Sequence, residues 1–270
     1  NSKENIYFFF KIIVLLCLIN SFIVLSQFFN IKSIFILEHL GVRRFYANIG
    51  QPNHLSTLFI TGIVATLILY RHQVIRVRTL YIISMYLTFF VFLTGSRTGV
   101  LLLLILLCLG FIFRRREYKT LNFYFFGFLF LLYIIISYYF TSNSRNTLEN
   151  IETTFSDSRF LLWSDSVSSI LENPWIGYGI NGVRTSRLFS NLNFKMPYVS
   201  SHNIFIDFFL WFGVVGGILF LIYSLIIFKR IYTNKKNGYE VLLFLTPFIV
   251  HSLFEYPFRY LYFLVLVIPA

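Results

Sequence analysis

The stretch HNIFIDFFLWFGVVGGILFLIYSLIIFKR, residues 202–230, decides the fold class of this chain. Its apolar part, 203–228, holds one charged residue, Asp207, and is followed by the basic pair Lys229 and Arg230. A helix of about 20 apolar residues crosses the hydrocarbon core of a bilayer. The stretch therefore predicts a transmembrane helix whose opening carries polar groups.

The rest of the chain repeats this pattern of apolar blocks separated by short polar segments. Hydrophobic residues make up 57% of the 270 residues and aromatic residues 21%. Such alternation predicts an all-α, polytopic transmembrane helical bundle, read as one membrane domain over 1–270. The segment 141–202 is expected to be a long outer loop that contains an amphipathic helix. The eight expected spans are 6–29, 55–70, 80–94, 98–113, 121–140, 203–228, 240–254 and a truncated 259–270.

Basic residues set the expected orientation of these spans. They cluster in the segments 71–79, 114–119 and 229–240. Lys and Arg accumulate in the cytoplasmic loops of membrane proteins. If these three segments are cytoplasmic, strict alternation puts 141–202 and the turn at 95–98 on the outer face.

The net charge of +12 is accounted for by such loops and does not predict a nucleic-acid partner. The two cysteines, Cys17 and Cys108, lie inside apolar segments and are interpreted as packing residues. The chain begins at Asn1 and ends at Ala270 within an apolar run. We therefore expect a fragment of a longer membrane protein.

A tight turn that carries an arginine separates two expected spans. In LTGSRTG, residues 93–99, Gly95 and Gly99 permit a sharp reversal, and Arg97 stands near the outer membrane boundary. Arg97 is either a snorkelling anchor for two helix ends or a ligand for a lipid-linked phosphate. A guanidinium suits phosphate because its fork of donors matches two oxygens and keeps its charge.

The long outer loop contains a predicted amphipathic helix over 158–173, which ends before Pro174. Arg159 falls in its first turn, where a cation opposes the helix dipole, so helix stability does not explain its position. Arg159 and the amides of that turn are expected to face an anion; the alternative is an ion pair with Asp157 or Asp165. The predicted apolar face consists of Phe160, Trp163, Val167, Ile170 and Leu171.

Three polar residues, His202, Asn203 and Asp207, stand at the opening of the span 203–228. For His202 the structural alternative is helix capping or interfacial hydrogen bonding. Asp207 either orients His202 or pairs with a neighbouring arginine. A small-residue surface for close helix packing is expected from Gly213, Gly216 and Gly217.

Two further polar clusters are expected on the same outer face. Each joins a proline turn to a histidine and nearby charge: residues 43–58, with Arg44, Asn53 and His54, and residues 250–263, with Glu255. Neither cluster predicts a function by itself.

Together these residues resemble the O-antigen ligase superfamily, which includes O-antigen ligases, repeat-unit polymerases and protein O-oligosaccharyltransferases. The resemblance rests on the order of the motifs. His202-Asn203 is followed by Gly213 and Gly216, and is preceded by Ser96-Arg97, by Arg159 and Trp163, and by Pro174, Gly177 and Gly179. The strings GQPNHL and HSLFEYP look most like the ligases that place glycans on pilins or other proteins.

The resemblance implies transfer of an oligosaccharide from an undecaprenyl-diphosphate carrier to an acceptor hydroxyl, on lipid A core or on a protein. It also implies a multi-pass protein of the bacterial inner membrane with its active site on the periplasmic face. By position, His202 would act at the reacting centre, and Arg97 and Arg159 would bind the diphosphate. No metal and no cofactor are expected, and membrane lipid is a further partner. The residues expected to support the site are Asn203, Asp207, Arg44, Asn53, His54 and Glu255.

Three alternatives remain at this stage. A repeat-unit polymerase shares the chemistry but uses another lipid-linked glycan as acceptor. A flippase of lipid-linked sugars predicts charges near the membrane midplane in several spans, whereas the mid-span charges are few: Lys11, near one end, and Asp207. A structural membrane subunit predicts that His202 and the outer arginines are replaceable.

Overall fold

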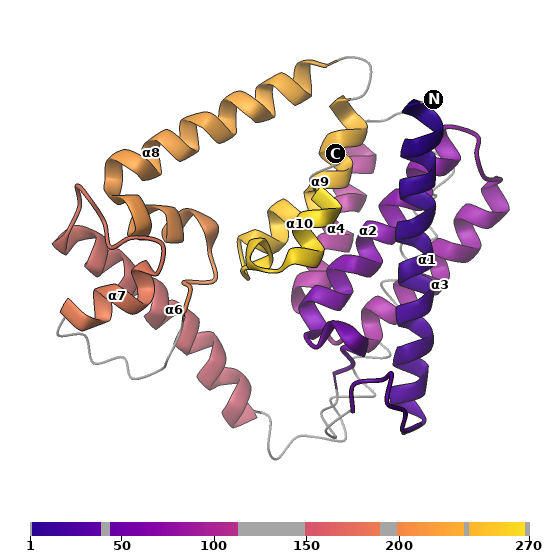
Figure 1. Cartoon of the computed structure of the whole chain (residues 1–270), viewed down its shortest axis with the longest axis horizontal. Coiled ribbons are helices and arrows are strands. Elements are labelled where there is room, and N and C mark those ends of the chain that lie inside the picture. The colour runs from indigo at the N-terminus through magenta and orange to yellow at the C-terminus, as the bar shows by residue number, and fades with distance from the viewer. Residues whose placement is uncertain (1, 39–43, 113–148, 190–198, 235–237, 268–270) are drawn as a thin grey trace. The chain divides into compact units, whose positions relative to one another are not determined.

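The computed structural model describes residues 2–38, 44–112, 149–189, 199–234 and 238–267, and within these ranges it contains helices and no strand. This confirms the all-α fold class (Figure 1). The α-helices are α1 (Ser2–Phe28), α2 (Pro52–Arg71), α3 (Val77–Leu93), α4 (Arg97–Ile112), α6 (Glu149–Glu172), α7 (Gly182–Phe189), α8 (Ile204–Thr233), α9 (Gly238–Ser252) and α10 (Leu261–Val267). Short 3₁₀ helices cover Ala47–Ile49 (η1) and Pro257–Arg259 (η3).

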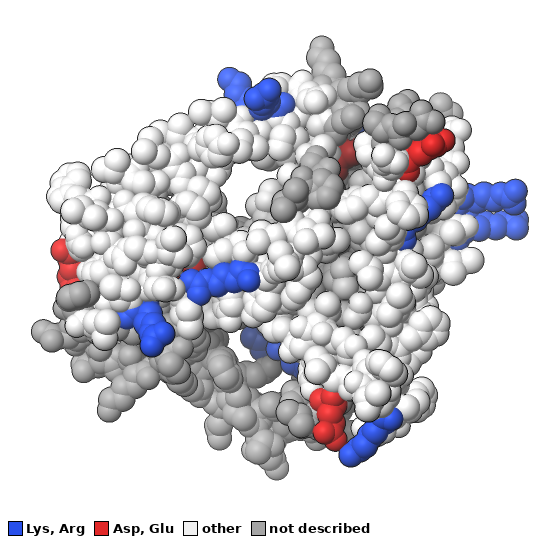
Figure 2. Space-filling view, viewed as in Figure 1, with Lys and Arg blue, Asp and Glu red and all other residues white. Residues whose placement is uncertain are grey.

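Three described helices are long and apolar enough to cross a membrane: Glu4–Phe28, Pro52–Arg71 and Ile204–Thr233. Shorter apolar helices cover Val77–Leu93, Arg97–Leu106 and Gly238–Ser252. Figure 2 shows a surface that is mostly uncharged, with Lys and Arg in small separate groups. The chain is therefore a membrane protein. The expected span 121–140 lies outside the described residues, and the count of eight spans in one domain stays a prediction.

The chain divides into two compact units. The first contains α1 to α4 together with residues 243–247 of α9, and the second contains α6, α7, α8, α10 and the remainder of α9. Each unit holds one of the polar clusters that the sequence singles out.

In the first unit, α2 is the central helix and packs against α1, α3 and α4. Its hydroxyl residues are buried, which would be costly without hydrogen-bond partners. Each finds one in the preceding turn: Thr57 donates to Asn53 O, Thr61 to Thr57 O and Thr66 to Gly62 O. A helix that satisfies its own polar groups in this way can lie at the centre of a membrane bundle.

In the second unit, α6 and α7 pack against α8, which breaks its helical geometry at Gly213. The backbone turn 174–179 fits into this break, since Tyr178 N donates to Leu210 O at 2.7 Å and Gly179 N to Trp211 O at 3.0 Å. In return Val214 N donates to Pro174 O at 2.6 Å. Figure 1 shows α8 changing direction along its length.

Two glycines make this backbone contact possible. Gly213 has φ +68, and a Cβ there would lie 2.5 Å from Trp175 O; Gly177 has φ +72, and a Cβ there would lie 2.5 Å from Gly213 N. Any side chain would therefore collide with backbone and strain the chain at a positive φ. The expectation that Gly213 belongs to a small-residue helix-packing surface is wrong, because it meets a turn, while Gly216 and Gly217 face the rings of Phe212 and Phe209.

The amphipathic helix of the outer loop differs from its prediction in length and in register. It begins at Glu149, so Arg159 lies inside α6 and not in its first turn, and the expectation that first-turn amides join Arg159 at an anion is wrong. The buried face consists of Leu162, Ser166 and Ser169. Of the predicted apolar face, Phe160, Val167 and Leu171 are exposed. Small hydroxyl residues lie inward because they permit close packing on α8.

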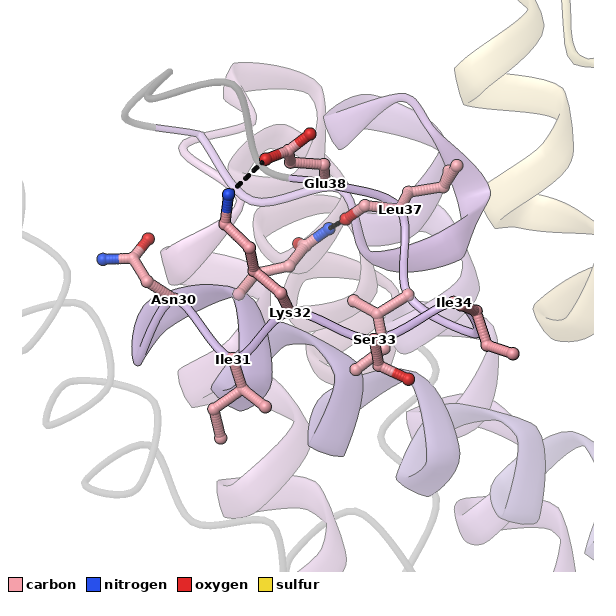
Figure 3. A pocket seen from close by; sticks show the side chains of 9 residues that line it. Asn30, Ile31, Lys32, Ser33, Ile34, Leu37 and Glu38 are labelled. Carbon is pink, nitrogen blue, oxygen red and sulfur yellow. Dashed lines mark hydrogen bonds and ion pairs between the residues drawn. The ribbon is translucent and has the colours of Figure 1, made fainter.

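The segment that follows α1 forms a shallow pocket of about 460 Å³ (Figure 3). Lys32 Nζ and Glu38 Oε1 form an ion pair across it at 3.0 Å, with side chains that are 84% and 66% exposed. Gln27 Nε2 donates to Leu37 O and to Ala47 O beneath it. An ion pair this exposed contributes little to stability, so Lys32 and Glu38 are suitable control positions for substitution.

Candidate functional site

His202 lies immediately before α8 in a conformation that is uncommon for a residue with a side chain. Its φ is +59, in the left-handed region, and the side chain is 15% exposed. This conformation costs about 1–2 kcal/mol for a non-glycine residue. Such a residue persists only where its surroundings hold it. The contacts around His202 must therefore hold it in this conformation.

Asn203 begins α8 as its N-cap. Its Oδ1 accepts hydrogen bonds from Phe205 N at 3.0 Å and Ile206 N at 3.3 Å. Its Nδ2 donates to Leu253 O at 3.3 Å, from the end of α9. Asn203 thus caps the membrane helix and connects it to the turn that follows α9.

Asp207 holds the backbone that precedes His202. Its carboxylate is fully buried and accepts hydrogen bonds from Ser200 Oγ at 2.6 Å and Ser201 N at 2.8 Å. Ser200 Oγ in turn accepts from His202 N at 3.1 Å. Within the described structure, Asp207 therefore acts on the backbone of His202 through Ser200 and Ser201. The sequence left open whether Asp207 orients His202 or pairs with an arginine.

Trp163 of α6 secures the same loop from the other side. Its Nε1 donates to Ser201 O at 2.8 Å. Arg159 lies four residues earlier in the same helix. The side chain of Arg159 is outside the described part of the chain, so its role as a diphosphate ligand stays a prediction.

Glu255 reaches the ring of His202 from the turn after α9. His202 Nδ1 and Glu255 Oε2 lie 2.8 Å apart, and the Glu255 side chain is 6% exposed. The backbone of Glu255 is itself fixed, since its N–H donates to His251 O at 2.8 Å. The ring of Tyr256 meets the imidazole edge to face, with centroids 4.8 Å apart. The imidazole is thus held at one nitrogen and along one edge.

Tyr256 is not a candidate for the proton acceptor. Burial, and then its hydrogen bond with Tyr260, raise the pKa of Tyr256 to about 12. The phenol therefore keeps its proton at neutral pH.

The first unit contains a second polar cluster, at the turn between α3 and α4. Arg44 donates through Nη2 to Asn53 Oδ1 at 2.8 Å and through Nε to Thr94 O at 3.2 Å. Ser96 Oγ also donates to Asn53 Oδ1, at 2.9 Å, and accepts from Gly99 N at 3.0 Å. Asn53 is therefore the common partner that joins Arg44 to the turn.

Arg97 and His54 lie next to this cluster. Arg97 is the first residue of α4 and its side chain is exposed. The His54 side chain is buried. The backbone N–H of His54 donates to Oε1 of Gln51, the N-cap of α2, at 2.7 Å. His54 is thus a residue of the helix start, and Arg97 is the group of this cluster that faces outward.

Each unit brings together part of the residue set predicted from the sequence. Arg44, Asn53 and the Ser96-Arg97 turn meet in the first unit. His202, Asn203, Asp207 and Glu255 meet in the second. A common chamber for Arg97, Arg159 and His202 stays a prediction. The described residues contain no group of three or more His, Cys, Asp or Glu side chains that could hold a metal ion.

Sequence reasoning missed Ser200, Ser201 and the hydrogen bond of Trp163 to the loop. The serine pair directly precedes His202-Asn203, so the signal was the string SSHN. Serines next to a helix cap bond to nearby backbone groups, and that tendency could have drawn attention to them.

Comparison with known proteins identifies the family. The family model described as O-antigen ligase matches residues 80–221, which is 142 of the 270 residues. The chain belongs to the O-antigen ligase family. The matched range includes the Ser96-Arg97 turn, the 174–179 turn and His202, whereas Arg44, Asn53 and Glu255 lie outside it.

Two relatives from Acinetobacter baylyi extend the match beyond that range. One, a ComP-specific O-oligosaccharyltransferase, is 29% identical over 248 residues, which cover 87% of this chain and 44% of the relative. The other, a general O-oligosaccharyltransferase, is 26% identical over 265 residues, which cover 92% of this chain and 46% of the relative. The chain thus spans about half the length of the curated relatives it matches. These similarities support the resemblance to the protein-glycosylating ligases.

Proposed function

We propose that this chain carries the transfer centre of a protein O-oligosaccharyltransferase. The donor is an oligosaccharide linked to undecaprenyl diphosphate, and the acceptor is a serine or threonine hydroxyl of a protein. The reaction takes place on the periplasmic face of the inner membrane. It requires neither a metal nor a cofactor, because an acid–base residue and fixed cations suffice for it.

The step is a displacement at the anomeric carbon of the donor. The acceptor oxygen forms a bond to that carbon, and the bond between the carbon and the diphosphate oxygen breaks. His202 takes the proton of the attacking hydroxyl, and undecaprenyl diphosphate leaves with the electron pair. Positioned proton transfer of this kind contributes about 10²- to 10⁴-fold in rate.

The observation that carries the proposal is the way His202 is held. It stands at the opening of a membrane-spanning helix, in a left-handed conformation, with its side chain 15% exposed. Two buried carboxylates, Asp207 and Glu255, maintain its backbone and its ring. A capping histidine needs no such arrangement, because Asn203 already caps α8.

The arginines complete the proposal. Arg97 and Arg159 bind the diphosphate, since guanidinium groups stabilise the negative charge that grows on the leaving group. Arg44 and Asn53 support this function by holding the turn that carries Arg97. His54 contributes through the start of α2, from which Asn53 also comes.

The acceptor distinguishes this proposal from its alternatives. Both relatives are named as O-oligosaccharyltransferases, which favours a protein acceptor over lipid A core or a growing glycan. A flippase would move the lipid-linked glycan without breaking its bond to diphosphate. Only the product of the reaction separates these functions.

The test uses the full-length protein in nanodiscs, with a labelled lipid-linked oligosaccharide and each type of acceptor. We expect label on the protein acceptor, and we expect His202→Ala to reduce transfer by about 10²-fold or more. Lys32→Ala, an exposed surface change, should leave transfer unchanged. Label on lipid A core or on a longer lipid-linked chain would replace the proposed acceptor. Normal turnover by His202→Ala would remove the catalytic assignment.

A further inference from the structure

We propose that Glu255 is the positioning residue of His202: it fixes the imidazole in the tautomer that carries its proton on Nδ1, so that Nε2 takes the proton of the acceptor. This inference rests on the proposed function and deepens it. It assigns a role to a residue that lies outside the range of the family model and 53 positions from the histidine.

The first argument is the geometry of the pair. The Nδ1 to Oε2 distance of 2.8 Å is that of a charge-assisted hydrogen bond. Both side chains are largely withdrawn from solvent, at 15% and 6% exposure, so water competes weakly for either group. An ionised carboxylate accepts hydrogen bonds and donates none, so the proposed tautomer with its proton on Nδ1 is the one that suits this contact.

The second argument is that the partner is held independently of the pair. The turn after α9 is joined to the start of α8 by a separate hydrogen bond, from Asn203 Nδ2 to Leu253 O. The backbone N–H of Glu255 donates to His251 O. The carboxylate therefore reaches His202 from a turn whose position does not depend on the ion pair, as a group that positions another must.

The third argument is chemical. When Nδ1 keeps its proton and donates a hydrogen bond to Glu255, the lone pair of the neutral ring lies on Nε2. Nε2 can then accept the proton of the attacking hydroxyl. The imidazolium formed in that step lies against the Glu255 carboxylate, which stabilises its charge. The edge contact with Tyr256 restricts ring rotation and so keeps Nδ1 directed at Glu255.

The pair also has a structural interpretation, in which it only fastens the α9 turn to α8. That role predicts lower stability for any replacement of Glu255, without a change in the tautomer of His202. The two roles therefore differ in a spectroscopic signature and in the separation of kcat from KM.

The experiment uses full-length protein labelled with ¹⁵N-histidine, at a pH where free imidazole is neutral. The His202 resonances are assigned by their loss in His202→Ala. We expect a protonated Nδ1 and an unprotonated Nε2 in the wild type, and a mixture of tautomers in Glu255→Leu. Glu38→Gln, a change to an exposed carboxylate in the first unit, should leave the spectrum unchanged. A proton on Nε2 in the wild type, or an unchanged spectrum in Glu255→Leu, would overturn the proposal.

Kinetics supply the second measurement. We expect Glu255→Leu to lower kcat by about 10²-fold while the KM for the lipid-linked donor stays within about two-fold. Glu255→Gln, which retains an oxygen acceptor for Nδ1–H, should lose less. If His202→Ala were active, the proposed function itself would fail. If His202→Ala were inactive and Glu255→Leu had a normal kcat, only the positioning role would fail.

Discussion

The polar clusters of the two units contain charged groups of opposite sign. In the first, the Arg44 guanidinium binds neutral oxygens, those of Asn53 and the Thr94 backbone. In the second, the Asp207 and Glu255 carboxylates bind hydroxyl, amide and imidazole donors. The first cluster thus places an arginine against amide and carbonyl oxygens, whereas the second places a histidine among carboxylates.

This difference matches the two tasks of the proposed reaction. A leaving diphosphate needs a fixed positive charge, and a guanidinium provides it at any physiological pH. An attacking hydroxyl needs a base that changes its charge during the reaction, which is the property of imidazole. The predictions below alter one region at a time, from the largest expected effect to the smallest.

Asp207 gives the largest expected effect, since it lies at the centre of the second region. Asp207→Leu leaves Ser200 Oγ and Ser201 N without their carboxylate, and each hydrogen bond to a charged group is worth about 1.5–3 kcal/mol. The left-handed conformation of His202 then loses its support. We expect a strong fall in thermal stability and loss of transfer, measured by thermal unfolding and by the nanodisc assay.

Asp207→Asn is the matched control for this prediction, because it keeps an oxygen acceptor for Ser201 N. It should retain part of both the stability and the activity. If the leucine variant were as stable as the wild type, the view of Asp207 as the support of the His202 backbone would be wrong.

Arg44 tests the first region with a smaller expected effect. A lysine has one compact ammonium and cannot reproduce the two directed contacts to Asn53 Oδ1 and Thr94 O. We expect Arg44→Lys to lose about 1–2 kcal/mol of stability. Because the turn that carries Arg97 loosens, the KM for the lipid-linked donor should rise more than kcat falls.

Donor titrations of Arg44→Lys and Lys32→Ala make this measurement. The second variant removes an exposed cation from the same unit and should behave as the wild type. A drop in kcat at constant KM for Arg44→Lys would instead connect Arg44 with the proton-transfer step and contradict the division between the two regions.

Tyr256 gives the smallest expected effect. Its pKa is raised to about 12, so its hydroxyl remains protonated from pH 6 to 9 and loses its proton only far above that range. Tyr256→Phe keeps the ring against His202 and removes the hydroxyl. The pH profile of kcat/KM should therefore be unchanged between pH 6 and 9. A limb of the profile that disappears in this variant would show that the phenol titrates in the reaction.

Sequence and structure agree most closely where the signal is local. The apolar run 203–228 overlaps the helix α8, and the runs 55–70 and 80–94 overlap α2 and α3. Length and hydropathy predict these helices because a bilayer requires each segment to satisfy its own backbone. The register of α6 was predicted wrongly, because the helix packs its small serines on α8 while Phe160 and Leu171 remain exposed.

The sequence alone determined that the protein is a helical membrane protein and that Ser96-Arg97, the 174–179 turn and His202 form a family pattern. These are properties of segment length, composition and order. Only the tertiary structure decided that Glu255 forms a hydrogen bond with His202, 53 positions away, and that the turn 174–179 packs against Gly213. The physical reason is that such pairings depend on how separate helices fold back on one another, which no local pattern of residues encodes.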